Sequence, residues 1–241
     1  MNNSDNIRIG LALGGGGAKG LSHIAFLRVF DELGITPSII SGTSIGALAG
    51  AFYASGMSAS EIYKHVEEMG LMEFGKLIDF SLLNRSGLLK GKGAERMLET
   101  YLPVRTFEEL KIPLKVVATD FWNRKEVIMN SGELIPALRA SMSLPSIFEP
   151  VIIGNTVCID GGMVNPLPFD IIIGECDYTV AIDVSGTKTA EDNEAIPKMT
   201  ETILQTFQIM QASMVNIRMR SLEPDIYIKP PLTNIRVLDF Y

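Results

Sequence analysis

Short apolar runs alternate with helically spaced apolar positions along the first part of the chain. Residues 8–13 form an apolar run that ends in four glycines, which is typical of a strand followed by a loop. Residues 19–33 carry apolar side chains at helical spacing, namely Leu21, Ile24, Ala25, Leu27 and Phe30. Gly34 and Pro37 end this predicted helix, because glycine suits the residue after a helix and proline blocks continuation.

The same alternation continues through the middle of the chain. Residues 38–41 and 114–119 are predicted strands, and a second helix is expected to begin near Ile45. Capping-box spacings predict two further helix starts, at Ser58 with Glu61 and at Thr106 with Glu109. Strands that alternate with helices in this way indicate βαβ units.

A hairpin is predicted in the second half of the chain. Residues 151–159 contain a Gly154-Asn155 turn between apolar flanks, a pattern that favours a hairpin and delivers Asp160 at its end. Further strands are expected at residues 178–184 and 226–229.

Three other segments depart from this pattern. Residues 197–220 form a predicted amphipathic helix, with apolar residues in steps of four and three at Ile203, Phe207, Met210, Met214 and Ile217. We expect this helix to pack on the sheet, while a lipid-contacting or dimer face stays open. Residues 185–193 predict an exposed loop, and the glycine-containing stretch 71–93 is interpreted as a mobile cover.

Length and charge restrict the class of protein. The chain has 241 residues, 46% hydrophobic and 20% charged, so it can bury a sizeable core, and a mainly disordered chain is excluded. We expect a single domain over residues 1–241, with a core at about 7–183 and the helix and strand of 195–230 packed on it. The net charge of −7 opposes the basic surface that nucleic acid requires, so nucleic acid is not an expected partner.

The cysteines and the N-terminal residues bear on the compartment. Cys158 and Cys176 are too few for a disulfide framework and show no metal-ligand spacing, so we expect reduced thiols and no metal. Residues 1–8 lack the apolar region of a secretory signal. The uncharged stretch 34–60 is too rich in glycine and serine for a bilayer helix. These features predict a cytoplasmic protein without a transmembrane segment.

A serine lies in the pattern Gly42-Thr43-Ser44-Ile45-Gly46, between a predicted strand and a predicted helix. In this context a strained strand-to-helix turn exposes the serine hydroxyl. Gly42 and Gly46 avoid side-chain collisions as the backbone turns, and the helix N-terminus favours negative charge that develops near Ser44. The position between strand and helix makes Ser44 a candidate nucleophile.

The second glycine motif, Gly14-Gly15-Gly16-Gly17-Ala18-Lys19-Gly20, also joins a strand to a helix. Consecutive unhindered amides at a helix start form an anion-binding nest. The dinucleotide pattern G-x-G-x-x-G is met at Gly15, Gly17 and Gly20. Residues 41–44, however, hold no acid for a ribose, and Lys19 is not followed by the Ser or Thr of a Walker loop. The remaining interpretation is an oxyanion hole.

The proton acceptor for Ser44 cannot follow the order of an α/β-hydrolase triad, which needs a histidine after the acid. His23 and His65 are the two histidines, and both are interpreted as packed or surface helix residues. A carboxylate is left as the candidate base. Asp160 stands at the predicted hairpin end beside two glycines, which permit an unusual backbone path.

Three motifs, in this order along the chain, resemble the signature of the patatin-like phospholipases. They are Gly15-Gly16-Gly17-Ala18-Lys19-Gly20, Gly42-Thr43-Ser44-Ile45-Gly46 and Asp160-Gly161-Gly162. The resemblance spans residues 7–183 and includes Ala140-Ser141, Leu144-Pro145, Phe148 and the tail Asn165-Pro166-Leu167-Pro168. It implies a three-layer α/β/α fold with a mostly parallel central sheet. It also implies a serine–aspartate dyad that acts on acyl esters of lipids without metal or organic cofactor.

The resemblance further implies a role for each matching residue. Ser44 is identified as the nucleophile, Asp160 as the general base, and the backbone amides of Gly15, Gly16 and Gly17 as the oxyanion hole. Lys19 is expected to order the glycine loop. The motif-supporting glycines are Gly20, Gly42, Gly46, Gly161 and Gly162. The segment Phe121-Trp122-Asn123-Arg124 departs from the small polar turn expected there, which bears on substrate preference.

The expected activity is phospholipase A-like or lysophospholipase-like hydrolysis of carboxylic esters through an acyl-enzyme, with a lipid or acyl ester as substrate. Peripheral contact with a membrane stays open, as does the oligomeric state. Two other classes remain, a catalytically silent lipid- or acyl-binding module on the same fold and a dinucleotide oxidoreductase. A fluorophosphonate probe should label Ser44 only in an enzyme, and failure to bind a nicotinamide cofactor would exclude the oxidoreductase.

Overall fold

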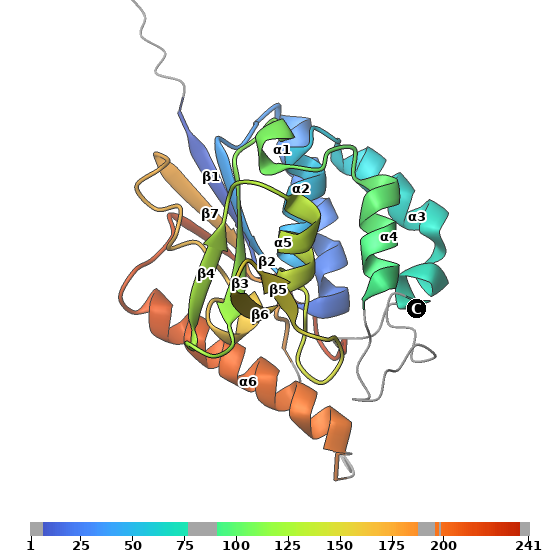
Figure 1. Ribbon diagram of the computed structural model, residues 1–241. Coiled ribbons are helices and arrows are strands. Elements are labelled where there is room, and N and C mark those ends of the chain that lie inside the picture. Colours follow the sequence, from blue (N-terminus) through green and yellow to red (C-terminus); the bar gives the residue numbers. More distant parts are fainter. Residues whose placement is uncertain (1–6, 77–90, 188–195, 198, 237–241) are drawn as a thin grey trace, which may run out of the picture.

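The computed structural model describes residues 7–76, 91–187, 196–197 and 199–236 (Figure 1). Its eight strands form a sheet in which hydrogen-bonded neighbours follow the path β5-β6-β3-β2-β1-β7-β8, and β4 pairs with β3 as well. The strands are β1 (Ile9–Leu13), β2 (Ile39–Thr43), β3 (Leu114–Asp120), β4 (Lys125–Met129), β5 (Val151–Ile153), β6 (Thr156–Asp160), β7 (Tyr178–Ile182) and β8 (Ile226–Ile228).

The central part of the sheet is parallel. The pairs β1–β2, β2–β3, β1–β7 and β7–β8 are parallel, whereas β3–β4, β3–β6 and β5–β6 are antiparallel. Parallel neighbours need crossover connections, and helices supply them here. The predicted α/β class with a mostly parallel sheet is confirmed.

The helices are distributed over the two faces of the sheet. They are α1 (His23–Leu33), α2 (Ile45–Ala54), α3 (Ala59–Lys76), α4 (Lys92–Tyr101), α5 (Leu134–Ser141) and α6 (Met199–Met219). Short 3-10 turns are η1 (Gly17–Ser22), η3 (Phe107–Glu109) and η4 (Gly161–Met163). Helices α1 to α5 lie on one face, and α6 crosses the other side near η4 (Figure 1). No helix in the described ranges is both long enough and apolar enough to cross a bilayer.

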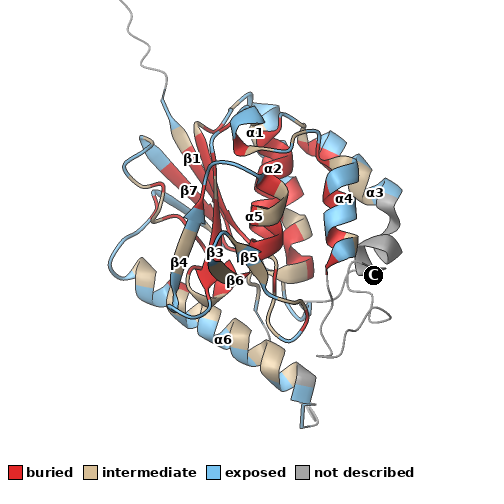
Figure 2. Cartoon of the chain, in the orientation of Figure 1, coloured by how far each residue is buried: buried red, intermediate tan, exposed pale blue. Residues whose placement is uncertain are grey.

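Two hydrophobic clusters hold the layers together. Leu11 and Leu13 of β1 face the larger cluster under α1 to α5. Ala12 faces a smaller cluster, which includes Phe169 and, from α6, Val215. This alternation follows from the two-residue period of a strand. Figure 2 shows α2 and the central strands as buried, while most of α6 is half-buried or exposed. The complete burial of α2 explains why the stretch around it carries no charge.

Several predicted boundaries agree with the structure. Gly34 takes the left-handed conformation after α1, with φ of 65°. Ser58 and Glu61 form the expected capping box at the start of α3, and the Gly154-Asn155 turn joins β5 to β6. The 197–220 helix and the 226–229 strand are present as α6 and β8.

Other expectations need correction. The Thr106–Glu109 capping box is present, but it begins only the three-residue turn η3, because Ile112 and Pro113 lead directly into β3. Residues 19–22 belong to η1, so the regular helix begins at His23. The elements α4, α5 and β4 were not predicted. Most of the expected cover at 71–93, and the expected loop at 185–193 beyond Thr187, lie outside the described residues.

Candidate active site

Ser44 occupies a strained turn between β2 and α2. Its φ of 54° and ψ of −124° place a non-glycine residue in a rarely populated region, and such strain is typical of functional turns. The turn brings α2 against the end of β1: a Cβ on Gly46 would lie 2.1 Å from the Leu13 carbonyl oxygen. A Cβ on Gly42 would lie 2.5 Å from Ala47 Cα. Both glycines are therefore required by close backbone approach.

The register of β3 explains why residues far apart in the sequence meet. Thr43, the last residue of β2, pairs with Val117, and Asp160, the last residue of β6, pairs with Ala118. Since β4 pairs with the same part of β3, it must occupy the opposite edge. Strands β2 and β6 therefore follow one another along a single edge of β3. The residue after Thr43 is Ser44, which consequently lies beside Asp160.

The two side chains form a direct hydrogen bond. Ser44 Oγ donates to Asp160 Oδ2 at 2.7 Å, and the Gly162 amide donates to Asp160 Oδ1 at 2.7 Å. Asp160 is buried, with 2% of its surface exposed. Burial raises the pKa of Asp160 to about 6, and the hydrogen bonds from Gly162 and Ser44 oppose this shift. A carboxylate with this pKa is a stronger base than an ordinary aspartate.

Neighbouring hydroxyls fix the backbone on both sides of this pair. The Ser44 amide donates to Ser141 Oγ at 2.8 Å, and Thr119 Oγ1 donates to the Asp160 carbonyl at 2.8 Å. The Asp160 amide donates to the carbonyl of Ser143 at 2.9 Å. The Ala140-Ser141 pair belongs to the family resemblance, whereas Thr119 and Ser143 carried no sequence signal of their own.

The glycine motif lies against the same site, with one difference from the expectation. The Gly15 amide donates to the Pro166 carbonyl at 2.9 Å, so this N–H is already bonded and is not an available oxyanion donor. The amides of Gly16 and Gly17 have no acceptor in the described part of the chain. The glycine motif therefore offers two free donors in place of the three that were predicted.

The segment after Asp160 joins the three motifs. Ser41 Oγ donates to the Pro168 carbonyl and Thr43 Oγ1 to the Asn165 carbonyl, each at 2.7 Å. Pro166 accepts from Gly15. The residues before Ser44, the glycine loop and the tail of the aspartate motif are thus held by one short stretch. These buried bonds make their relative positions rigid.

The remaining predicted residues lie around this centre. Buried His23 bonds through Nε2 to the Gly14 carbonyl at 2.8 Å, whereas His65 on α3 lies away from the pair. Lys19 is buried, and its Nζ donates to the carbonyl of Ile235 at 3.5 Å, so it reaches the C-terminal segment. The motif glycines Gly20 and Gly161 pack closely against Ile45 and Val117.

The pair lies in a cavity with about 440 Å³ of empty space, open solvent included. Its lining residues are Gly15, Gly16, Gly17, Ser44, Leu144, Asp160, Leu204, Phe207, Gln208 and Gln211. The last four belong to α6, whose contribution to the site was not predicted. A helical apolar pattern at 203–217 could have indicated contact with a pocket, but not which pocket. Across the described ranges, no three His, Cys, Asp or Glu side chains gather where they could hold a metal ion.

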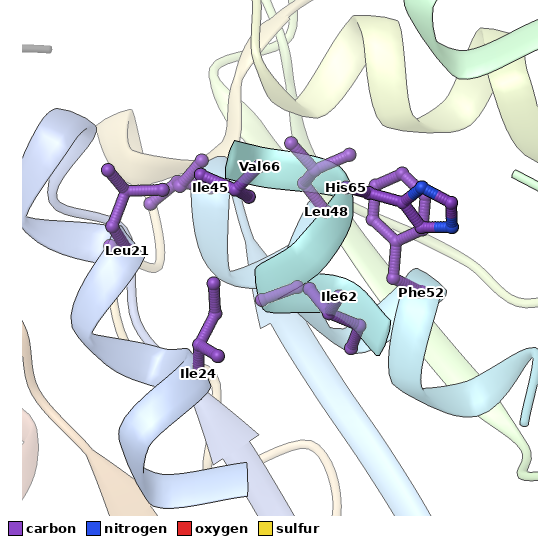
Figure 3. A pocket seen from close by; sticks show the side chains of 10 residues that line it. Leu21, Ile24, Ile45, Leu48, Phe52, Ile62, His65 and Val66 are labelled. Carbon is purple, nitrogen blue, oxygen red and sulfur yellow. The ribbon is translucent and has the colours of Figure 1, made fainter. Parts of the chain in front are cut away.

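A second cavity, with about 420 Å³ of empty space when open solvent is included, lies between α1, α2 and α3. Figure 3 shows the side chains that point into it: Leu21, Ile24, Ile45, Leu48, Phe52, Ile62, His65 and Val66. Apart from His65 these side chains are apolar. The two cavities share no lining residue, although Ser44 and Ile45 are neighbours in the chain.

Comparison with known proteins agrees with this arrangement. The family model described as patatin-like phospholipase matches residues 11–173, which include the glycine motif, the Ser44 turn and Asp160. The chain belongs to this family. The patatin-like match ends before β7, so α6 and β8 lie outside it.

Curated relatives cover most of this chain. An uncharacterised NTE family protein of Mycobacterium bovis is 32% identical over 201 residues, covering 82% of this chain and 54% of the relative. Lysophospholipase NTE1 of Kluyveromyces lactis is 26% identical, covering 96% of this chain and 18% of the relative. The chain thus spans about half the length of the mycobacterial relative.

The fold has a solved counterpart. The crystal structure of VipD from Legionella pneumophila matches with a TM-score of 0.50 and 17% identity, covering 89% of this chain and 55% of that chain. At this identity the likeness concerns the fold alone.

Proposed function

We propose that this patatin-like chain is a serine acyl hydrolase that cleaves carboxylic ester bonds of lipids, as a phospholipase A or lysophospholipase does. The observation that carries the proposal is the 2.7 Å hydrogen bond from Ser44 Oγ to the buried carboxylate of Asp160. A nucleophile in contact with a base is the arrangement that covalent catalysis requires. Membership in the patatin-like phospholipase family supports lipid esters as the substrate class.

In the first step Ser44 Oγ attacks the ester carbonyl carbon while its proton passes to Asp160. The amides of Gly16 and Gly17 donate to the oxygen that becomes negative in the tetrahedral intermediate. The N-terminus of α2 also favours negative charge near Ser44. When the intermediate collapses, Asp160 returns the proton to the departing alcohol oxygen, and an acyl-Ser44 ester remains.

In the second step water hydrolyses the acyl-enzyme. Asp160 accepts a proton from the attacking water, and the same two amides stabilise the second tetrahedral intermediate. Collapse releases the fatty acid and returns the proton to Ser44 Oγ. The raised pKa of Asp160 suits this exchange, because a base near its pKa both accepts and returns a proton readily.

A fluorophosphonate probe tests the proposal directly. We expect stoichiometric labelling of Ser44 in the intact chain, together with hydrolysis of a short-chain ester. Ser44→Ala should abolish both, whereas the matched control Ser60→Ala, at an exposed position on α3, should leave both unchanged. A chain that neither labels nor hydrolyses, yet gains thermal stability with a fatty acid, would be a silent acyl-binding module.

Peripheral contact with a lipid surface and a cytoplasmic location are also part of the proposal. The outer side of α6 supports contact with lipid, because Ile209 and Ile217 are 68% and 60% exposed. Sedimentation with phosphatidylcholine vesicles measures this contact. Recovery of all the protein in the supernatant would contradict it.

A further inference from the structure

Helix α6 contributes to the catalytic cavity although it lies outside the family match at residues 11–173. Leu204, Phe207, Gln208 and Gln211 line the cavity together with Ser44 and Asp160. The shared motifs therefore do not determine this wall of the site. Residues of this wall can therefore determine which esters this chain prefers as substrates.

One face of α6 carries both residues of the cavity wall and the residue that holds the helix in place. Leu204, Gln211 and Arg218 are seven positions apart, so they lie on one face of the helix. Arg218 Nη2 donates to the Val164 carbonyl at 2.9 Å, and Arg218 Nη1 pairs with Asp170. The face is thus fixed at its C-terminal end to the segment that follows Asp160.

Gln211 lies next to the catalytic carboxylate. A Cβ on Gly162 would come within 2.2 Å of Gln211 Nε2 and 3.0 Å of Asp160 Oδ1. The missing side chain of Gly162 therefore leaves the space that the Gln211 carboxamide occupies. In the described part of the chain this carboxamide has no hydrogen-bond partner, and it shares the α6 wall of the cavity with Leu204, Phe207 and Gln208.

We propose that Gln211 is a specificity-determining residue, whose amide binds an oxygen on the alcohol side of the ester. The proposal rests on the hydrolase function above. It specifies the substrate as an ester whose alcohol part carries further oxygen atoms, as glycerol does. A half-buried amide without a partner gains most from a ligand that completes its hydrogen bonds.

The chemistry of the leaving group places the alcohol beside Gln211. During acylation Asp160 must return its proton to the alcohol oxygen, so this oxygen has to lie within hydrogen-bond reach of Asp160. In the mechanism proposed above, the carbonyl oxygen binds the amides of Gly16 and Gly17 instead. The acyl chain would then pack against the apolar side chains of Leu144 and Leu204. Gln211, the neighbour of Asp160 and Gly162, therefore faces the alcohol.

The test compares two esters with the same acyl group, 1-octanoylglycerol and methyl octanoate, by the release of octanoic acid. Gln211→Leu removes the amide, and we expect kcat/KM for the glycerol ester to fall about tenfold, the effect of one lost hydrogen bond, with methyl octanoate changed by less than about twofold. Gln211→Met is a second variant of similar length. Gln205→Leu, on the same helix but outside the cavity lining, is the matched control and should change neither rate.

The outcomes separate this inference from the proposed function. A wild-type chain that hydrolyses neither ester refutes the hydrolase function and the inference with it. An active wild type whose Gln211 variants lose equally on both esters, or lose nothing, overturns the inference alone. Labelling of Ser44 by a fluorophosphonate should keep its wild-type rate in the Gln211 variants, because a role in positioning Asp160 would slow it.

Discussion

His23 Nε2 lies 2.8 Å from the carbonyl oxygen of Gly14, so the first residue of α1 bonds back to the first residue of the glycine motif. A carbonyl oxygen only accepts, which means that Nε2 carries the proton. Complete burial lowers the pKa of His23 to about 4, and the ring is neutral at pH 7. His23 thus fixes the loop that presents the Gly16 and Gly17 amides.

Replacing His23 tests this support. His23→Leu leaves the Gly14 carbonyl buried without its donor, and we expect a loss of about 1–3 kcal/mol in the free energy of unfolding, measured in urea. Ester hydrolysis should fall as well, because the Gly16 and Gly17 amides, which we propose as oxyanion donors, lose their fixed position. His65→Leu is the matched control at a histidine outside the site, and its hydrolysis rate should match wild type. An unchanged rate in His23→Leu would contradict the supporting role.

The neutral state of His23 also predicts an acid-dependent loss of stability. Its folded pKa, about 4, lies below the ordinary value of 6.5, so the unfolded chain binds more protons between these values. The contribution of neutral His23 to the free energy of unfolding is complete above pH 6.5 and is lost as the pH falls toward 4. Relative to wild type, His23→Gln should therefore become less destabilised as the pH is lowered through this window. Parallel curves for the two proteins would contradict it.

Two glycines on α2 should respond very differently to alanine. A Cβ on Gly46 meets the Leu13 carbonyl oxygen at 2.1 Å, whereas a Cβ on Gly50 meets the Ile40 side chain at 3.0 Å. Backbone cannot move aside as a side-chain methyl can, so Gly46→Ala should cost about 3 kcal/mol or more. In Gly50→Ala the helix propensity gained by alanine, about 1 kcal/mol, offsets the tighter packing. Urea unfolding of the two variants measures the contrast, and equal losses would contradict it.

The sequence predicted the local elements around the site because each has a short-range signal. The Ser44 turn needs close approach at Gly42 and Gly46, and Gly34 needs a left-handed residue, so the residue types themselves mark the backbone. The hairpin before Asp160 has its own turn signal in Gly154-Asn155. Elements without such signals, α4, α5 and β4, were missed.

Contacts between distant segments could not be predicted in the same way. The donation of the Gly15 amide to Pro166 depends on where the 165–168 tail lies, and no pattern around Gly15 encodes that position. The approach of Gln211 to Gly162 depends likewise on the anchoring of α6 by Arg218. The resemblance supplied the pairing of Ser44 with Asp160, whereas the register along β3 supplies its physical cause.

Hydrolysis should depend on the ionisation of Asp160. Because only the carboxylate form accepts the Ser44 proton, kcat/KM for a neutral ester should rise with pH through about 6 and then level off. Initial rates between pH 4.5 and 8.5 measure the profile, and circular dichroism at each pH shows whether the fold persists. A flat profile over this range, with the fold intact, would exclude Asp160 as the base.

Because its carboxylate is buried, Asp160 should give the wild-type protein a lower free energy of unfolding at neutral pH than the Asp160→Asn variant has. The folded pKa of Asp160, about 6, lies above the ordinary value of 3.8, so the folded state binds more protons between these values, and stability falls as the pH rises through this window. In Asp160→Asn, the side-chain oxygen can still accept from the Gly162 amide and the new NH₂ can donate to Ser44 Oγ.

We therefore expect Asp160→Asn to be inactive and yet more stable than wild type by about 2–3 kcal/mol above pH 7, with the difference shrinking toward zero near pH 4. Urea unfolding of both proteins at unit steps from pH 4 to 8 measures this difference. The contribution of His23 is common to the two proteins and cancels. A variant that is less stable at pH 8, or a difference that does not change with pH, would show that burial does not disfavour the ionised form of Asp160.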